Sequence, residues 1–213
     1  MRINSFLIVG CIAASLWAWQ QPKFAEQNLV FSLNNLVQGR YWTLLTALFV
    51  HGSLLHLFGN MVFLFVFGGT LENNIGAPRH LAVFLAGGLT GFVLSLPFVA
   101  PNAGMLGASA AIFAVAACVM LVRPLRFSWL FLAPQGLVAV LYFLYNLVVV
   151  YDPTLIPGYD PQVAYIAHII GFVTGIPFGI AWSHNWRKNF LITLVLLGIY
   201  GAILKMVEGF LKQ

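Results

Sequence analysis

The chain has 213 residues, of which 61% are hydrophobic and 7% are charged. Ordinary soluble domains carry about 25% charged residues, so the composition excludes that class and indicates a polytopic helical membrane protein. Membrane β-barrels alternate apolar and polar residues in segments of about ten, whereas the apolar runs here are continuous and longer. The formal charge of +5 is spread over the connections without a basic cluster, so no nucleic-acid partner is expected.

Seven apolar segments divide the chain, over approximately residues 4–20, 54–72, 80–100, 104–122, 127–150, 163–183 and 189–208. Crossing a hydrocarbon core of about 30 Å takes about 20 residues, and each segment except the first approaches that length. The first segment could also be a secretory signal peptide, but Trp17 and Trp19 fit better as aromatic anchors at a membrane interface. The sequence predicts an all-α, multi-pass membrane bundle. One domain over residues 1–213 is expected, with a six-helix core over about 4–183 and a seventh, extra helix over about 189–208.

The basic residues of the connections predict an orientation. If the seven segments alternate across the membrane, six basic residues share one side and four share the other. An excess of Lys and Arg marks the cytoplasmic side, so the N-terminus is expected in the cytoplasm and the C-terminus outside. The first side holds Arg2, Arg79, Arg123, Arg126, Arg187 and Lys188, and the second holds Lys23, Arg40, Lys205 and Lys212.

Two connections on the outer side differ from the rest. Residues 21–53 form a long amphipathic link, a pattern typical of helices that lie in the membrane interface. Residues 151–161 contain three prolines and one glycine, which exclude a regular helix. We expect this second connection to form a loop that covers what lies beneath it.

Polar side chains within the apolar segments are costly in a bilayer and are therefore candidates for function. His56 and Asn60 lie about two and six residues into the second segment, and Ser109 and His168 lie about five residues into the fourth and sixth. At 1.5 Å per residue, all four are expected roughly 3–9 Å below the same surface. Three segments thus bring Ser, His, His and Asn to one shallow layer.

Small residues flank the serine and the second histidine of this layer. Gly107 and Ala108 precede Ser109, and Gly171 and Gly175 follow His168 on one helix face. Glycines four residues apart allow helices to approach closely, which a short serine side chain needs to reach a histidine. Taken singly, the serine could bond to its own helix, the histidine could serve packing or proton transfer, and the glycines could serve packing alone.

The chain resembles the rhomboid intramembrane serine proteases over residues 42–179. The matching motifs are Trp42, His51-Gly-Ser-Leu-Leu-His56-Leu-Phe-Gly-Asn60, Gly68-Gly69, Glu72-Asn-Asn-Ile-Gly76, Gly107-Ala-Ser109 and Ala167-His168-Ile-Ile-Gly171-Phe-Val-Thr-Gly175. The last apolar segment resembles the family variant that has one extra C-terminal helix.

The resemblance implies a catalytic dyad of Ser109 as nucleophile and His168 as general base, without a third carboxylate. It also implies an oxyanion hole formed by the Ser109 backbone N–H, His56 and Asn60. His56 and Asn60 are four residues apart and share a helix face, which agrees with this role. His51 is expected to anchor the long outer link rather than to do chemistry.

Three positions depart from the family pattern. Thr43 follows Trp42 where the family often has arginine, and Ala110 follows the serine where the family often has glycine. Phe113 stands where the family often has tyrosine, so it can stack on His168 but cannot donate a hydrogen bond. No catalytic atom is removed by these changes.

The sequence thus predicts an intramembrane serine endopeptidase that cleaves membrane proteins with a single transmembrane helix. No metal or small-molecule cofactor is implied, and Cys11 and Cys118 are expected to be structural. A prokaryotic plasma membrane is expected, with the active site open to the outer side. Two alternatives are an inactive relative that binds membrane proteins and, less favoured, a small transporter. Inactive relatives usually lack the serine or histidine, and transporters tend to show internal repeats that are not visible here.

Overall fold

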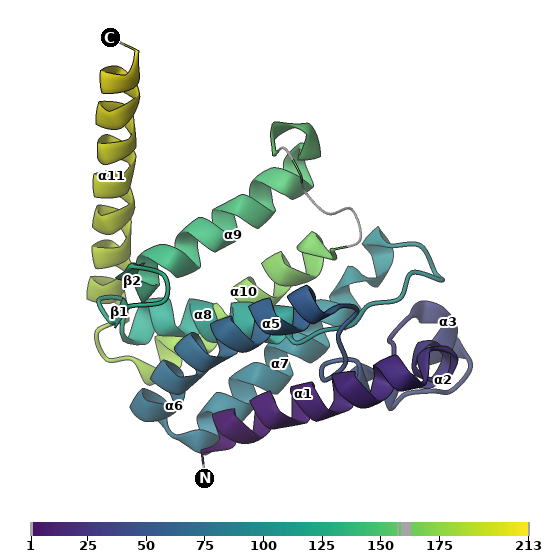
Figure 1. The fold of residues 1–213 in the computed structure, drawn as a ribbon. Helices are drawn as coiled ribbons and strands as arrows, with labels where there is room; N and C mark the ends of the chain where they lie inside the picture. The colour runs from purple at the N-terminus through teal and green to yellow at the C-terminus, as the bar shows by residue number, and fades with distance from the viewer. Residues whose placement is uncertain (1, 157, 159–162, 213) are drawn as a thin grey trace.

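The computed structural model describes residues 2–156, 158 and 163–212, and the chain is folded as a bundle of helices (Figure 1). The α-helices are α1 (Ile3–Gln20), α2 (Pro22–Asn28), α3 (Leu33–Val37), α4 (Thr43–Thr46), α5 (Leu54–Phe63), α6 (Gly69–Ile75), α7 (Ala77–Ser95), α8 (Ser109–Val122), α9 (Gln135–Tyr151), α10 (Tyr165–Trp182) and α11 (Trp186–Leu211). A π-helix (Leu64–Gly68) joins α5 to α6, and 3-10 turns cover Leu96–Phe98 and Pro153–Leu155. Strands β1 (Phe127–Ser128) and β2 (Ala133–Pro134) pair in an antiparallel hairpin.

Among the described residues, five helical stretches are long and apolar enough to cross a membrane, and α8 and α9 are shorter apolar helices. This arrangement confirms the predicted all-α membrane bundle. Two predicted starts are wrong. The fourth segment becomes helical at Ser109 rather than near residue 104, and the fifth becomes helical at Gln135 rather than near residue 127. The hairpin occupies the beginning of the fifth segment, and an extended stretch occupies the beginning of the fourth.

Helix α8 lies at the centre of the bundle, and α5, α7, α9 and α10 surround it (Figure 1). Every residue of α8 from Ala110 to Leu121 is buried. A helix with no face toward lipid does not have to match the thickness of the bilayer, which explains why 14 residues are enough. The non-helical backbone before it is tolerated at membrane depth because it is enclosed by protein.

Glycines on the surfaces of α7 and α10 that face α8 allow these two helices to lie close to it. On α10, a Cβ at Gly171 would overlap the Ala110 carbonyl oxygen, and a Cβ at Gly175 would overlap the Ala114 carbonyl oxygen. On α7, a Cβ at Gly91 would lie 2.6 Å from the Ala110 Cβ. The α10 backbone therefore packs directly against the α8 backbone, and the α7 backbone packs against alanine methyl groups of α8, as in other small-residue membrane interfaces.

Backbone hydrogen bonds hold the extended stretch that leads into α8. Phe31 and Met105 exchange two backbone bonds of 3.0 and 2.7 Å, and the Gly107 N–H donates to the Ala47 carbonyl at 2.8 Å. Gly107 has a φ of +109°, a conformation that favours glycine. The chain can therefore turn sharply and begin α8 at Ser109.

The start of α1 is fixed by the junction between α5 and α6. The Glu72 carboxylate accepts the backbone N–H groups of Ile3 and Asn4 at 2.9 and 3.0 Å. The Asn4 side chain donates to the Leu64 carbonyl at 3.1 Å, at the first residue of the π-helix. A carboxylate at a helix N-terminus is favoured by the helix dipole, so Glu72 both caps and positions α1.

The outer link folds into α2, α3 and α4, which confirms that this amphipathic segment is helical. Polar contacts tie the link together: the Arg40 guanidinium bonds to the Gln27 carbonyl and to Asn35, and the Trp42 indole donates to the Asn28 carbonyl. In the second connection, Asp152 begins a short 3-10 turn, and its pKa is lowered by hydrogen bonds from Thr154. Residues 157 and 159–162 of the expected covering loop lie outside the described residues.

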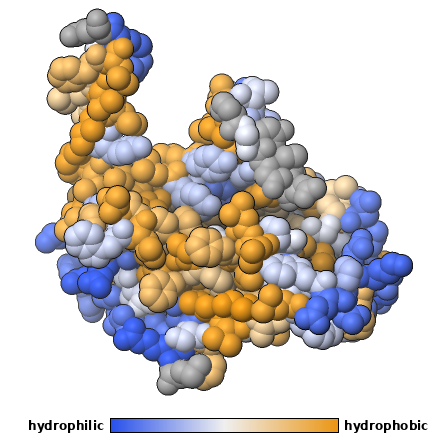
Figure 2. All heavy atoms as spheres, viewed as in Figure 1, coloured by the Kyte–Doolittle hydropathy of each residue, from blue (hydrophilic) through white to orange (hydrophobic). Residues whose placement is uncertain are grey.

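Helix α11 leaves one end of the bundle and projects away from it (Figure 1). Asn189 attaches its first turns by donating to the Leu121 and Val122 carbonyls at 2.7 and 3.2 Å, and Thr193 is its one buried residue. On the face drawn in Figure 2, apolar residues cover most of α11 and the middle of the bundle, and polar residues gather at the two ends. This belt is the surface expected of a protein that spans a bilayer.

The packing of α10 on α8 generates a test of stability. Gly175→Ala should lower the free energy of unfolding by about 1–3 kcal/mol, because the new Cβ forces two backbones apart. Gly198→Ala in α11 is the matched control, since a Cβ there meets nothing within 4 Å. Thermal unfolding of the purified variants measures both, and a Gly175→Ala midpoint equal to that of Gly198→Ala would show that the close contact is not needed.

Candidate active site

Ser109 and His168 lie in hydrogen-bond contact although they are 59 residues apart in the sequence. The Ser109 Oγ is 2.7 Å from His168 Nε2. Ser109 is the first residue of α8, and His168 lies in the first turn of α10. The serine is half-buried and the histidine is 8% exposed, so the pair lies at the rim of the protein interior.

Two neighbours restrain the imidazole ring of His168. Phe113 lies one turn into α8 and stacks on the ring, with centroids 4.7 Å apart and planes 8° apart. The second ring nitrogen, Nδ1, is 2.7 Å from the Asn146 side-chain oxygen on α9. Asn146 is missing from the sequence-based candidates, although an amide inside an apolar segment is a signal that could have found it.

His56 lies on α5 above the sharp turn that precedes Ser109. A Cβ on Gly107 would lie 2.8 Å from both Cε1 and Nε2 of His56, so this ring rests directly on the glycine. The hydroxyl of Ser53 caps α5 by accepting the His56 backbone N–H at 3.1 Å. The structure therefore brings His56 beside the backbone that carries Ser109, and only glycine fits beneath it.

Asn60 lies one helical turn beyond His56 and is 8% exposed. Its side-chain nitrogen donates to the His56 carbonyl at 2.8 Å, a bond between residues four apart on one helix. This bond uses one of the two hydrogens of the amide. The bond orients the amide from the α5 backbone.

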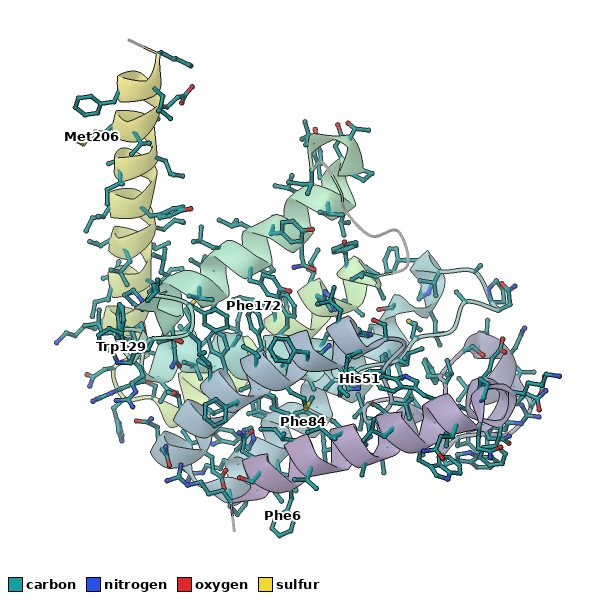
Figure 3. The ribbon with its side chains drawn as sticks, viewed as in Figure 1. Phe6, His51, Phe84, Trp129, Phe172 and Met206 are labelled. Carbon is teal, nitrogen blue, oxygen red and sulfur yellow. The ribbon has the colours of Figure 1, made fainter. Side chains whose placement is uncertain are left out.

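His51 is held in a chain of hydrogen bonds away from the Ser109 hydroxyl. Its Nε2 accepts the Ala108 backbone N–H at 3.3 Å, so the hydrogen of the neutral ring lies on Nδ1 and donates to the Ser15 hydroxyl at 3.1 Å. The Trp19 indole on α1 donates to the His51 carbonyl at 2.7 Å. Figure 3 shows His51 near the ends of α1 and α5. The ring thus joins α1 to the turn before α8.

Burial, followed by the proximity of the His56 ring, lowers the pKa of His51 to about 3. The ring lies in the connection before α5 and is 2% exposed. It is therefore neutral at physiological pH, as the bond from Ala108 requires. The burial and hydrogen bonds of His51 suit a residue that stabilises the fold rather than one that takes part in a reaction.

The departure from the family pattern at Ala110 has a compensating feature. Its Cβ points at Gly91 on α7, and its carbonyl faces Gly171 on α10. An extra methyl group is accommodated because both neighbouring helices present glycine at this level. Ala110 therefore does not displace Ser109 from His168.

An apolar cavity of about 620 Å³ opens between α9 and α11. Tyr142 and Tyr145 on α9, Phe131 before β2, and Tyr200 on α11 are among its lining residues. The ring of Tyr142 also stacks on Phe113, with centroids 5.0 Å apart. Within the described ranges, no group of three His, Cys, Asp or Glu side chains could hold a metal ion.

The fold and this site define a polytopic helical membrane protein with a serine and a histidine in contact inside the bundle. A family model, the Rhomboid domain, matches residues 38–185. The chain therefore belongs to the rhomboid family, and it is an integral, multi-pass membrane protein.

Individual relatives include proteases and an inactive protein. The chain is 30% identical over 190 residues to the rhomboid protease GlpG of Haemophilus influenzae, covering 87% of this chain and 93% of that protein. It is 31% identical over 152 residues to RHOMBOID-like protein 7 of Arabidopsis thaliana, covering 70% of this chain and 46% of that protein. It is 29% identical over 188 residues to the human inactive rhomboid protein 2, covering 82% of this chain and 20% of that protein. The plant and human matches span less than half of those proteins.

The depressed pKa of His51 generates a test of pH dependence. Below about pH 6.5 an unfolded chain protonates this ring, whereas the folded protein does not until about pH 3, so stability falls as the pH drops through this window. The His51 ring should lower the free energy of unfolding by up to about 1.4 kcal/mol for each pH unit within this window.

His51→Gln should therefore be less stable than the parent at neutral pH but should lose less stability on acidification to about pH 5. Denaturant unfolding at several pH values measures this slope, and His184→Gln, which changes an exposed ring, is the control. Equal slopes for the parent and His51→Gln would show that the ring is not buried in its neutral form.

Proposed function

We propose that this rhomboid protein is an intramembrane serine endopeptidase in which Ser109 is the nucleophile and His168 is the general base. The observation that carries the proposal is the 2.7 Å contact between Ser109 Oγ and His168 Nε2. A hydroxyl activated by an imidazole at this distance can attack a carbonyl carbon. The sequence resemblance and the protease relatives support the same reaction class.

The reaction proceeds in two halves. Ser109 Oγ attacks the scissile carbonyl while its proton passes to His168 Nε2, and the resulting imidazolium returns that proton to the leaving amine as the peptide C–N bond breaks. The substrate's carbonyl half remains bound to Ser109 as an ester. His168 then takes a proton from the water that attacks the ester, and returns it to Ser109 Oγ as the ester C–O bond breaks.

Negative charge develops on the substrate oxygen during each attack. The backbone N–H of Ser109 lies at the N-terminus of α8, where the helix dipole favours an anion. His56 and Asn60 supply further donors from α5, and the position of the His56 ring over Gly107 supports this role. Such preorganised donors are most effective in a site that excludes water.

The substrate class follows from the surroundings of the dyad. The apolar belt and the apolar cavity beside Tyr142 suit a hydrophobic segment that arrives through the bilayer (Figure 2). We propose single-span membrane proteins as substrates, with the whole chain acting as one domain. The positive-inside bias supports a cytoplasmic N-terminus and a site that opens to the other side. The membrane that we propose is a prokaryotic plasma membrane.

A catalytically inactive binding protein is the second candidate, because the human inactive rhomboid protein 2 is among the relatives. The presence of both Ser109 and His168 in hydrogen-bond contact favours the protease.

Covalent labelling tests the nucleophile. A fluorophosphonate should react with Ser109 in the purified protein, and the label should be lost in Ser109→Ala and strongly reduced in His168→Ala because the hydroxyl is no longer activated. The same two variants should fail to cleave a single-span substrate in liposomes. Cleavage at the parental rate by Ser109→Ala would disprove the mechanism.

A second test separates catalysis from structure at α5. Removing one oxyanion donor in a serine hydrolase costs about 10²–10³ in kcat. Hydrogen bonds within membrane proteins stabilise the fold by only about 0.6 kcal/mol on average. Asn60→Ala and His56→Ala should therefore unfold near the parental midpoint but cleave far more slowly. A large drop in midpoint with a nearly normal kcat would assign both residues to the scaffold.

A further inference from the structure

We infer that Asn146 is a positioning residue for His168 and the third member of a Ser109–His168–Asn146 hydrogen-bonded triad, an assignment that rests on the proposed function. Asn146 lies on α9 and is 1% exposed. Three helices thus each contribute one member, since Ser109 starts α8 and His168 lies on α10. The family resemblance predicts a dyad with no third carboxylate, and the third group here is a neutral amide.

The orientation of the Asn146 amide is fixed by its own helix. Its Nδ2 lies 2.7 Å from the Tyr142 carbonyl oxygen, one turn earlier on α9. A carbonyl can only accept, so the NH₂ group must face Tyr142 and the amide oxygen must face the other way. That oxygen is 2.7 Å from His168 Nδ1.

This orientation determines the tautomer of the histidine. Because the Asn146 oxygen can only accept, His168 Nδ1 must carry a hydrogen and donate it. In the neutral ring the other nitrogen, Nε2, then has a free lone pair, and this lone pair faces the Ser109 hydroxyl. The opposite tautomer would place two lone pairs against each other at Asn146 and would offer the serine a hydrogen rather than an acceptor.

Phe113 and Asn146 restrain different motions of the same ring. Stacking on Phe113 fixes the plane of the imidazole, as their 8° interplanar angle shows. Stacking alone does not decide whether Nε2 or Cε1 points at Ser109, because a ring flip exchanges these two atoms and preserves the plane. The hydrogen bond to Asn146 makes that selection.

A neutral amide suits the apolar surroundings. An unpaired carboxylate in the resting site would be expensive to bury, whereas an amide satisfies its oxygen with His168 and one N–H with Tyr142. When His168 becomes an imidazolium during catalysis, Nδ1 keeps its hydrogen and the bond to Asn146 persists. Asn146 therefore orients the base without exchanging a proton with it.

Two substitutions distinguish positioning from space filling. Asn146→Leu keeps a similar volume but removes the acceptor, and should reduce kcat about 10- to 100-fold, as when the partner of a metal-bound imidazole is removed. KM should change little, because Asn146 does not touch substrate. Asn146→Asp, with its carboxyl protonated, can still donate to Tyr142 and accept from His168, and should retain most of the activity. Asn74→Leu is the matched control, since Asn74 makes the same bond to a carbonyl four residues earlier on α6.

Nitrogen-15 NMR of protein labelled at its five histidines reads the tautomer directly. In the parent, His168 should show a protonated Nδ1 and an unprotonated Nε2, and in Asn146→Leu this pattern should be lost. A parent with hydrogen on Nε2 would overturn the assignment even if Asn146→Leu does not fold. Parental kcat and tautomer in a folded Asn146→Leu would overturn it as well. If Ser109→Ala cleaves like the parent, the proposed protease function has failed. If cleavage depends on Ser109 but Asn146→Leu keeps the parental kcat, only the positioning role of Asn146 has failed.

Discussion

The close approach of α7 and α10 to α8 is the constraint on which the rest of the site depends. A serine side chain reaches only a short distance, so its partner must stand on a helix whose backbone lies almost against its own. Gly171 and Gly175 provide this approach from α10, and Gly91 provides it from α7. Larger side chains at these positions would separate the helices and with them Ser109 and His168.

The position of Ser109 at the very start of α8 solves a second problem. A serine within a helix tends to bond to its own backbone, whereas the first residue of a helix is free of that competition on its N-terminal side. The preceding turn at Gly107 also brings the His56 ring over the backbone that carries the nucleophile. The same turn is anchored through Ala108 and His51 to α1. The fold therefore determines the direction of the hydroxyl from several elements at once.

The sequence was sufficient to predict the membrane bundle and to single out Ser109 and His168, which the structure brings into contact. Long apolar segments indicate the membrane helices. Polar groups are rare within such segments, so four residues can be recognised there: His56, Asn60, Ser109 and His168. The starts of α8 and α9 were not predictable from hydropathy, since a buried extended segment is as apolar as a buried helix. Asn146 is also a polar group within an apolar segment, but its role depends on a contact with a residue 22 positions away, which the sequence does not display. The fit of Ala110 against Gly91 likewise depends on packing between helices, which one sequence does not display.

The proposed mechanism requires Ser109 to form a covalent ester with the substrate during cleavage. Intact-protein mass spectrometry of the purified protein, quenched during turnover of a single-span substrate in liposomes, tests it most directly. We expect an adduct on Ser109 with the mass of the substrate's N-terminal fragment less one water, absent from Ser109→Ala. Rapid cleavage without any adduct, continuing undiminished in Ser109→Ala, would contradict it.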